Sequence, residues 1–343
     1  MSLISVLMPA YNSEKYIGLA IKSILSQSLS DFEFIIIDDG STDNTHEIIS
    51  SFTDKRIRYY RNDINEGLTR VRNKLISLAV TEYLAFLDSD DIADQNRLKE
   101  EYALFQSNKA LDLVAASAVA INPMGGKRNE KWSFNLDADQ LKAHLLFYNP
   151  VVTSTVMFRK SKVPVDGFRI GYPPCEDYDF WTRMLYSGKG VVLPVVLVAY
   201  RLHDASISKV QSQDAISNRN KVVLDQLAFY FAGKYSQEEA DLHLGLVDFS
   251  MKNNKEDINR LLVWVERLIS LNKQYDYFND EVLRQLLYDR LLKKLLRLKK
   301  YDLSVFRALK QVNAFLNPKK STMHLKKELA ILLFSFFRNK FID

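Results

Sequence analysis

Over about its first 90 residues the chain alternates short β-branched runs with amphipathic stretches, and this alternation restricts the fold more than any other feature. Apolar runs at residues 3–8, 33–38, 57–61 and 83–87 predict four strands, the first of which ends at Pro9. The stretches between them have helical spacing of their apolar residues. A strand–helix–strand–helix order predicts an α/β fold with a mostly parallel sheet covered by helices on both faces.

The pattern loosens in the second part of the chain. Residues 111–119, 155–158 and 191–201 resemble strands, and residues 122–131 read as a loop. A helix is expected from Glu176 or Asp177 to Tyr186, and almost everything after residue 211 has a helical pattern. We therefore expect an α/β catalytic domain over residues 1–210 and a helical C-terminal region over residues 211–343.

Composition excludes several classes of protein. Apolar residues make up 47% and charged residues 26%, as expected of a chain that forms a core. A single cysteine, Cys175, excludes a disulfide framework and a cysteine-based zinc site. The longest apolar run, residues 330–337, is far shorter than the roughly 20 residues of a membrane span. With no secretory signal at the start, we expect a cytoplasmic location.

Positive charge is concentrated at the C-terminal end. Residues 284–343 carry a formal charge of +11, while the rest of the chain carries −6. Around residues 287–300 the basic residues fall mostly on one side of a helical wheel and the leucines on the other. A basic amphipathic helix suits an anionic membrane surface, and residues 330–341 offer a second apolar and basic stretch. The alternative is a helical region that packs its leucines internally or in a homo-oligomer; nucleic acid is the least favoured partner.

Polar clusters follow three of the four predicted strands. In an open parallel sheet, ligands bind outside the carboxyl ends of the strands, so these clusters predict one shared site. The three clusters are Pro9-Ala10-Tyr11-Asn12, Asp38-Asp39-Gly40-Ser41 and Asp88-Ser89-Asp90-Asp91.

Two common nucleotide-binding loops are missing from the sequence. It contains neither Gly-x-Gly-x-x-Gly nor Gly-x-x-x-x-Gly-Lys-Ser/Thr, and no glycine-rich loop follows the first strand. A bound diphosphate would then need a metal ion to offset its charge. Asp88 and Asp90, two residues apart at a strand end, suit Mg²⁺ or Mn²⁺; the alternative is an N-cap cluster for the next helix.

Each remaining candidate has a structural alternative. Asp39 could accept the N3–H of uracil or simply belong to an Asp-Gly turn. Tyr11 could offer its ring face to a base or serve packing alone. Arg70 and Arg72 share one helix, and one of them is expected to face the diphosphate unless both are surface charges.

Acidic residues also begin the helix at Glu176-Asp177-Tyr178-Asp179. Acids at a helix N-terminus are stabilised by the helix dipole and need no further role. An inverting displacement nevertheless needs a carboxylate as general base near the acceptor hydroxyl. His203 follows the strand-like residues 191–201, where it could be structural or a metal ligand.

Six segments together resemble family 2 glycosyltransferases with the GT-A fold. They occur in the order of that family over residues 6–208, and their combination is far more specific than any one of them. The length and the last two segments are most similar to bacterial lipooligosaccharide β-1,3-N-acetylglucosaminyltransferases and their galactosyl relatives. The segments are VLMPAYN (6–12), IDDGSTD (37–43), NEG (65–67), FLDSDD (86–91), EDYDFW (176–181) and YRLHDASIS (200–208).

The resemblance implies a role for each matching residue. The uridine would be held by Pro9, Ala10, Tyr11 and Asp39, and the ribose and diphosphate would lie near Asp88 and Ser89. Asp90 would bind the metal with His203 and Asp88, and Asp177 would be the general base. We add to the donor-binding residues Asn12, Glu14, Asn65, Gly67 and Arg72.

The resemblance also implies a reaction. The processive members carry a Gln-x-x-Arg-Trp motif, which this sequence lacks, so we expect one sugar per encounter. The expected enzyme is inverting and depends on Mn²⁺ or Mg²⁺. It would transfer GlcNAc, Gal or GalNAc from UDP to a glycan or lipid-linked saccharide at the inner face of a bacterial membrane. The alternatives are a non-catalytic nucleotide-sugar-binding protein and a protein that binds nucleic acid through its tail.

Overall fold

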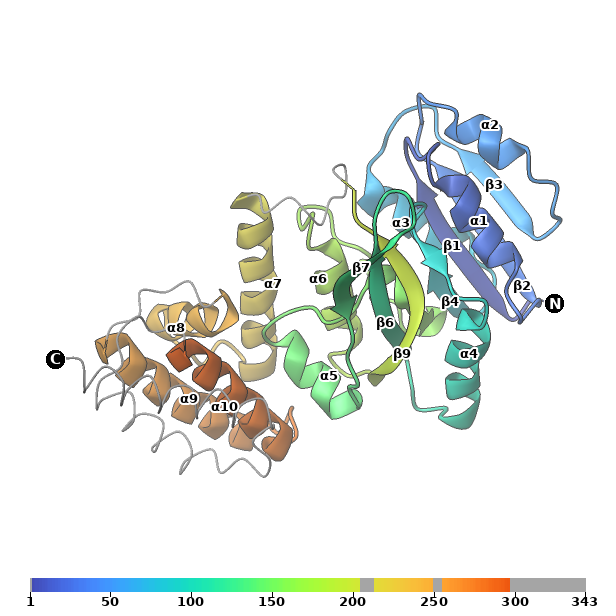
Figure 1. The fold of residues 1–343 in the computed structure, drawn as a ribbon. Helices are drawn as coiled ribbons and strands as arrows, with labels where there is room; N and C mark the ends of the chain where they lie inside the picture. The colour runs from blue at the N-terminus through green and yellow to red at the C-terminus, as the bar shows by residue number, and fades with distance from the viewer. Residues whose placement is uncertain (1, 204–212, 249–254, 297–343) are drawn as a thin grey trace, which may run out of the picture. The chain divides into compact units, whose positions relative to one another are not determined.

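The structure is a computed structural model that describes residues 2–203, 213–248 and 255–296. The chain divides into two units (Figure 1). Unit 1 comprises residues 1–145 and 149–222, and unit 2 comprises residues 146–148 and 223–343. The domain boundary expected after residue 210 falls within residues 204–212, outside the described residues.

The first four strands of unit 1 are parallel, as predicted. They lie in the order β3-β2-β1-β4 and are separated along the chain by three helices. The strands are β1 (Ile4–Ala10), β2 (Phe32–Asp38), β3 (Ile57–Arg61) and β4 (Tyr83–Phe86). The helices are α1 (Ile17–Leu25), α2 (Thr45–Ser50) and α3 (Leu68–Leu78).

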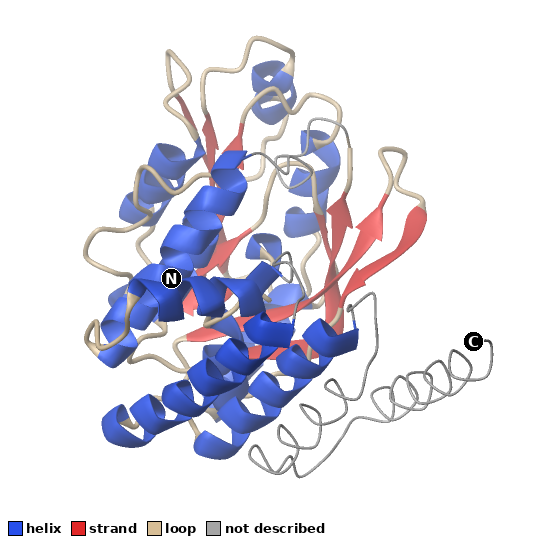
Figure 2. Cartoon of the chain, turned by 90° about the vertical axis from the view of Figure 1, so that its left-hand side faces the viewer, coloured by secondary structure: helices blue, strands red, loops and turns tan. Residues whose placement is uncertain are grey.

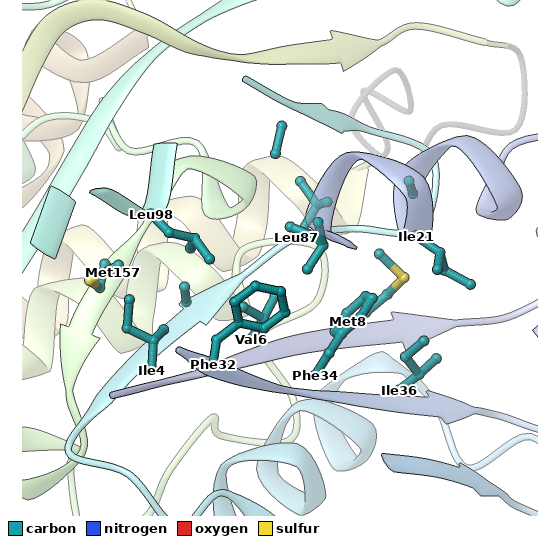
Figure 3. Packing of buried hydrophobic residues seen from close by; sticks show 14 of the residues in the cluster. Ile4, Val6, Met8, Ile21, Phe32, Phe34, Ile36, Leu87, Leu98 and Met157 are labelled. Atoms are coloured by element: carbon teal, nitrogen blue, oxygen red, sulfur yellow. The ribbon is translucent and has the colours of Figure 1, made fainter. Parts of the chain in front are cut away.

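The main core lies between the parallel strands and α1. Alternate residues of a strand point to one face, so Ile4, Val6 and Met8 of β1 join Phe32 and Phe34 of β2 in one buried cluster (Figure 3). Helix α1 adds its buried apolar stripe to this cluster, and α3 contacts β1 and β2 on the other face. Burial on both faces explains the uninterrupted apolar runs of the sequence.

The first strand does not end at Pro9, as the sequence analysis expected, but runs on to Ala10. Pairing of β1 with β4 stops at the Leu7–Phe86 pair, while pairing with β2 continues to Ala10. The Leu7 carbonyl faces β4, where it accepts the Leu87 N–H, and Pro9 faces the same side two residues later. Because β4 has ended there, the N–H that proline lacks has no ladder partner to lose.

The second half of unit 1 makes the sheet mixed. The strands predicted in this half are present, but β8 is antiparallel to both β4 and β6, while β9 is parallel to β6. The helix expected after the acidic cluster is α4 (Arg97–Ser107), which has Asn96 and not an aspartate at its N-cap, while helix α5 (Ala138–Leu145) and the short strand β5 (Ile92–Ala93) were not anticipated. The other elements are β6 (Leu113–Ile121), η1 (Thr153–Thr155), β8 (Met157–Arg159), η2 (Lys160–Lys162), α6 (Glu176–Met184) and β9 (Gly190–Arg201).

The loop predicted at residues 122–131 is wrong for its second half. Residues Lys127–Trp132 form strand β7, which pairs antiparallel with β6. Five of its six residues are exposed and four are charged, so it has no apolar alternation that periodicity could detect. An edge strand needs only backbone pairing on one side, and charged side chains are typical of such edges.

The described part of unit 2 that follows residue 222 is helical (Figure 2). Helix α7 (Gln213–Phe231) crosses the division between the units, and α8 (Gln237–Asp248), α9 (Lys255–Tyr275) and α10 (Asp280–Leu296) follow it. Among the described residues, no helix combines the length and the apolarity that crossing a membrane requires.

The basic helical face expected around residues 287–300 is not formed where the structure describes it. Arg290 and Lys294 of α10 are buried, not exposed to solvent. Both donate hydrogen bonds to carbonyls of the last turns of α8, at Gly245, Leu246 and Val247. Cations there satisfy carbonyls that lack helical partners and complement the helix dipole. Residues 297–300 and 330–341, also expected to contact a membrane, lie outside the described residues.

The turn after β2 supplies a test of the local geometry. Gly40 has φ +70°, and an added Cβ would lie 2.7 Å from the Ile64 carbonyl carbon. We expect Gly40→Ala to lower the free energy of unfolding by about 1–3 kcal/mol. Gly125→Ala is the matched control, because Gly125 has φ +85° but nothing within 4 Å of the added atom; it should cost about 1 kcal/mol. Equal losses in urea unfolding would show that the contact with Ile64 is unimportant.

Candidate functional site

The predicted polar clusters do meet at the carboxyl ends of the parallel strands. Ala10 ends β1 opposite Asp38, the last residue of β2, and the Asp39 N–H donates to the Ala10 carbonyl at 2.8 Å. The Leu87 N–H donates to the Leu7 carbonyl, so the acidic segment after β4 begins beside the same edge. Parallel pairing thus brings together three segments that are far apart in sequence.

Asp39 is buried and its carboxylate holds the turn that precedes α3. Its Oδ1 accepts hydrogen bonds from Asn62 Nδ2 at 2.7 Å and the Glu66 N–H at 2.9 Å, and its Oδ2 accepts the Gly67 N–H at 2.8 Å. A carboxylate oxygen can accept about two hydrogen bonds. Oδ2 therefore has room for one more donor, which fits the base N–H expected there.

The other predicted donor residues near β1 differ in their surroundings. Pro9 and Ala10 are buried within β1, while Tyr11 is 48% exposed. Asn12 and Glu14 connect the loop after β1 to the loop after β2. The Thr42 N–H donates to Asn12 Oδ1 at 2.9 Å, and Asn44 Nδ2 donates to Glu14 Oε2 at 2.8 Å. Ser89 lies next to the same loop, with its hydroxyl 2.7 Å from that of Ser13.

Carboxylates crowd together after β4. Burial raises the pKa of Asp90, and the negative charge of Asp88 adds to the increase. Burial also raises the pKa of Asp91 well above its usual range, and the charges of Asp90 and Asp88 raise it further. Asp91 Oδ1 accepts the Arg201 N–H at 2.8 Å. Such crowding favours a compensating cation.

Of the three predicted metal ligands, Asp90 and His203 meet. His203 Nε2 lies 2.9 Å from Asp90 Oδ2, whereas Asp88 Oδ1 lies 3.3 Å from Arg72 Nη2. Within the described ranges, no three acidic, histidine or cysteine side chains converge as a metal-binding group. Two carboxylates and an imidazole are nevertheless suitable ligands for Mn²⁺, and a cation would offset both the burial and the neighbouring charge of Asp88 that raise the pKa of Asp90.

Arg72, predicted to bind the donor, is buried and bridges two carboxylates. Its Nη1 donates to Glu176 Oε1 at 2.9 Å and its Nη2 lies 3.3 Å from Asp88 Oδ1. The guanidinium also lies over the Phe168 ring, 5.5 Å from its centroid. Arg70, the alternative, is exposed and donates to the carbonyl of Glu66. Arg72 therefore connects the end of β4 to the start of α6.

Asp177 lies in the first turn of α6 and is half-buried. Its Oδ2 accepts hydrogen bonds from Thr153 Oγ1 at 3.1 Å and Asn149 Nδ2 at 3.3 Å. Burial raises its pKa to about 6, as does the charge of Glu176, while Arg72 opposes the increase. A carboxylate with this pKa is ionised near neutral pH yet basic enough to take a proton.

Residues of η1, which the sequence analysis did not single out, connect the two acidic groups. Thr153 holds Asp177, and the next residue, Ser154, accepts the Asp88 N–H at 3.1 Å and is hydrogen-bonded to Asp91. Neighbouring hydroxyl residues beside a strand were the one available signal, and this signal is common in turns.

Arg201 is a second residue that sequence reasoning missed. It is buried at the end of β9 and donates hydrogen bonds to the carbonyls of Asp90, Asn122 and Pro123. Its guanidinium also lies over the Tyr16 ring, 4.6 Å from the centroid. Arg201, two residues before His203, therefore fixes the backbone of the acidic segment at Asp90.

The Arg72 bridge can be tested by a double-mutant cycle. Arg72→Met leaves Asp88 and Glu176 without their shared cation, so we expect a loss of about 3–5 kcal/mol in the free energy of unfolding. The double variant Arg72→Met with Glu176→Gln should lose less free energy of unfolding than the sum of the losses in the two single variants. The control is Arg128→Met, because the Arg128–Glu130 pair is exposed and should contribute less than about 1 kcal/mol. Additive losses in urea unfolding would contradict a direct coupling.

Comparison with known proteins agrees with this architecture. A model of the family "Glycosyl transferase family 2" matches residues 5–163. An uncharacterized glycosyltransferase of Methanocaldococcus jannaschii is 31% identical over 227 residues, which are 63% of this chain and 77% of that protein. WfaP of Escherichia coli is 29% identical over 231 residues, 64% of this chain and 85% of WfaP.

Among solved structures, residues 1–349 of Staphylococcus aureus TarS with UDP-GlcNAc have a TM-score of 0.57 to this chain. The match covers 93% of both chains at 18% sequence identity, so it supports the fold alone. The family model, the sequence relatives and the strand-end site agree with one another. The chain belongs to the family 2 glycosyltransferases and is a glycosyltransferase with an α/β domain of the GT-A type.

Proposed function

We propose that the protein transfers one sugar from a UDP-sugar to a hydroxyl of a lipid-linked saccharide, with inversion at the anomeric carbon. The observation that carries this proposal is the position of Asp177. Its carboxylate, with a pKa of about 6, is held by Thr153, while the neighbouring Ser154 binds the acidic segment that would face the donor diphosphate. The short helix η1 thus contacts both the proposed base and the proposed donor site.

The relatives support the donor and acceptor classes. WfaP and WfgD of Escherichia coli are named as β-1,3-glucosyltransferases that use UDP-glucose and α-D-GlcNAc-diphosphoundecaprenol. WcaA of Escherichia coli is a putative colanic acid biosynthesis glycosyl transferase. UDP-glucose therefore joins UDP-GlcNAc, UDP-Gal and UDP-GalNAc as a candidate donor. A lipid-linked acceptor would bring the enzyme to the inner face of the cell membrane, as the sequence analysis expected.

The residues have distinct tasks in the reaction. Asp177 accepts the proton of the acceptor hydroxyl, and that oxygen forms a bond to the anomeric carbon on the face opposite UDP. The bond from this carbon to the diphosphate oxygen breaks and its electron pair leaves with UDP, so an α-linked donor gives a β-linked product. Asp88, Asp90 and His203 would hold Mn²⁺ or Mg²⁺, which when bound offsets the charge of the leaving diphosphate.

Donor binding is tested by thermal shift with the four UDP-sugars, in the presence of Mn²⁺ or of a chelator. We expect one UDP-sugar to raise Tm only with Mn²⁺, because ligand at 100 times its Kd stabilises a fold by about 2.7 kcal/mol. Asp90→Asn should abolish the increase, and Asp166→Asn, which changes an exposed aspartate outside the site, should keep it. An increase in Tm that survives chelation would rule out the metal site.

The role of Asp177 is tested by its own substitution. Asp177→Asn removes the proton acceptor, so we expect transfer to fall at least 100-fold while the donor-induced increase in Tm remains. In the wild type, kcat should fall about tenfold per pH unit below about pH 6, because protonation of Asp177 removes the base. The measurement is UDP release with α-GlcNAc-diphosphate on a short alkyl chain as acceptor. Unchanged transfer by Asp177→Asn would disprove the assignment.

A further inference from the structure

Three residues from the middle of the chain, Leu146–Tyr148, belong to unit 2. Leu146 and Phe147 are fully buried, which is unusual for a segment between a helix and a loop. The Phe147 ring stacks on His243 of α8 with a centroid distance of 4.9 Å, and the Arg290 guanidinium lies over Phe147 and Tyr148. Unit 2 therefore surrounds this segment with aromatic and cationic contacts.

His243 also holds the backbone of the segment. It is fully buried in α8, with Nε2 3.1 Å from the Leu146 carbonyl oxygen and Nδ1 3.4 Å from Trp264 Nε1. An indole N–H can only donate and a carbonyl can only accept. His243 therefore accepts at Nδ1 and donates from Nε2. Burial lowers the pKa of His243 to about 4, so this neutral tautomer persists at physiological pH.

The same stretch of chain then reaches Asp177 within unit 1. Asn149, the residue after Tyr148, donates from Nδ2 to Asp177 Oδ2, as does the Thr153 hydroxyl. On the other side of the segment, the Tyr178 hydroxyl donates to the Leu145 carbonyl, and the Tyr178 N–H donates to Asp177 Oδ1. The segment held by His243 thus lies between two anchors of the proposed base.

We propose that His243 is a positioning residue for transfer, which fixes the Leu146 carbonyl and thereby sets where Asn149 and Thr153 hold the Asp177 carboxylate. This inference rests on the proposed function, because it assumes that Asp177 is the general base. It gives the helical unit a task in catalysis: its buried core holds one piece of backbone three residues before Asn149.

The test compares His243→Leu with His243→Gln in the full-length protein. Leu removes the donor, whereas Gln places an amide N–H where Nε2 was. With UDP-glucose or whichever UDP-sugar raises Tm, and the short-chain α-GlcNAc-diphosphate acceptor, we expect His243→Leu to lower kcat roughly 10- to 100-fold. KM for the donor should change less than about twofold, and His243→Gln should restore most of kcat.

The pH profile separates positioning from a general loss of stability. Hydrogen bonds from Asn149 and Thr153 favour the charged form of Asp177, so weakening them should move the acid limb of kcat to higher pH in His243→Leu. Leu268→Ala changes a buried residue of α9. This substitution should lower the free energy of unfolding and leave unchanged the pH at which kcat falls on the acid side. If His243 acts through Asn149, the double variant His243→Leu with Asn149→Ala should be no slower than Asn149→Ala alone.

The outcomes distinguish this inference from the proposed function. Wild-type kcat and pH profile in His243→Leu, with Asp177→Asn inactive, would overturn the positioning role alone. Transfer by Asp177→Asn would instead overturn the proposed base. Should His243→Leu fail to fold, Trp264→Phe serves instead, because it removes the N–H donated to His243. A lower kcat whose acid side moves to higher pH supports the positioning role. An unchanged pH profile of kcat refutes it.

Discussion

One buried guanidinium, that of Arg72, holds carboxylates from two separate parts of the fold. Asp88 follows β4, Glu176 begins α6, and Arg72 is 4% exposed between them. Without a shared cation, the two acids would repel each other and would lack compensation for leaving water. The bridge lets the acidic segment after β4 and the proposed base lie close together, and it also limits how far the pKa of Asp177 rises.

The parallel half of unit 1 could be predicted because its determinants are local. Strands buried on both faces give continuous apolar runs, and the helices between them keep their spacing, so β1 to β4 and α1 to α3 follow from residues near in sequence. The mixed half could not be predicted in the same way. Strand β8 has three residues and pairs with β4 over more than 70 positions of sequence; its direction depends on these distant contacts.

The candidate site likewise contains residues that the sequence indicates and residues that only the structure shows. Asp39, Asp88, Asp90 and Asp177 could be chosen as candidates because acids at strand ends and helix starts are conspicuous and match an ordered set of motifs. Several residues that contact those acids were not chosen from the sequence. Ser154 contacts Asp88 across 66 positions and Arg201 contacts Asp90 across 111. A serine in a short turn and an arginine at the end of a strand are common in sequences, so only the folded chain shows what they bind.

The charge of the helical unit shows why residue type alone can mislead. Arg290 and Lys294 counted toward a basic membrane face, yet they are 7% and 2% exposed and donate to the carbonyls that end α8. Their stems add to the buried leucines of α10, and their charges complement the negative end of another helix. Residues 297–343, outside the described part of the chain, carry a formal charge of +8, which is most of the +11 carried by residues 284–343. The cations of α10 stabilise the unit that holds Leu146–Tyr148, so their main task is inside the fold.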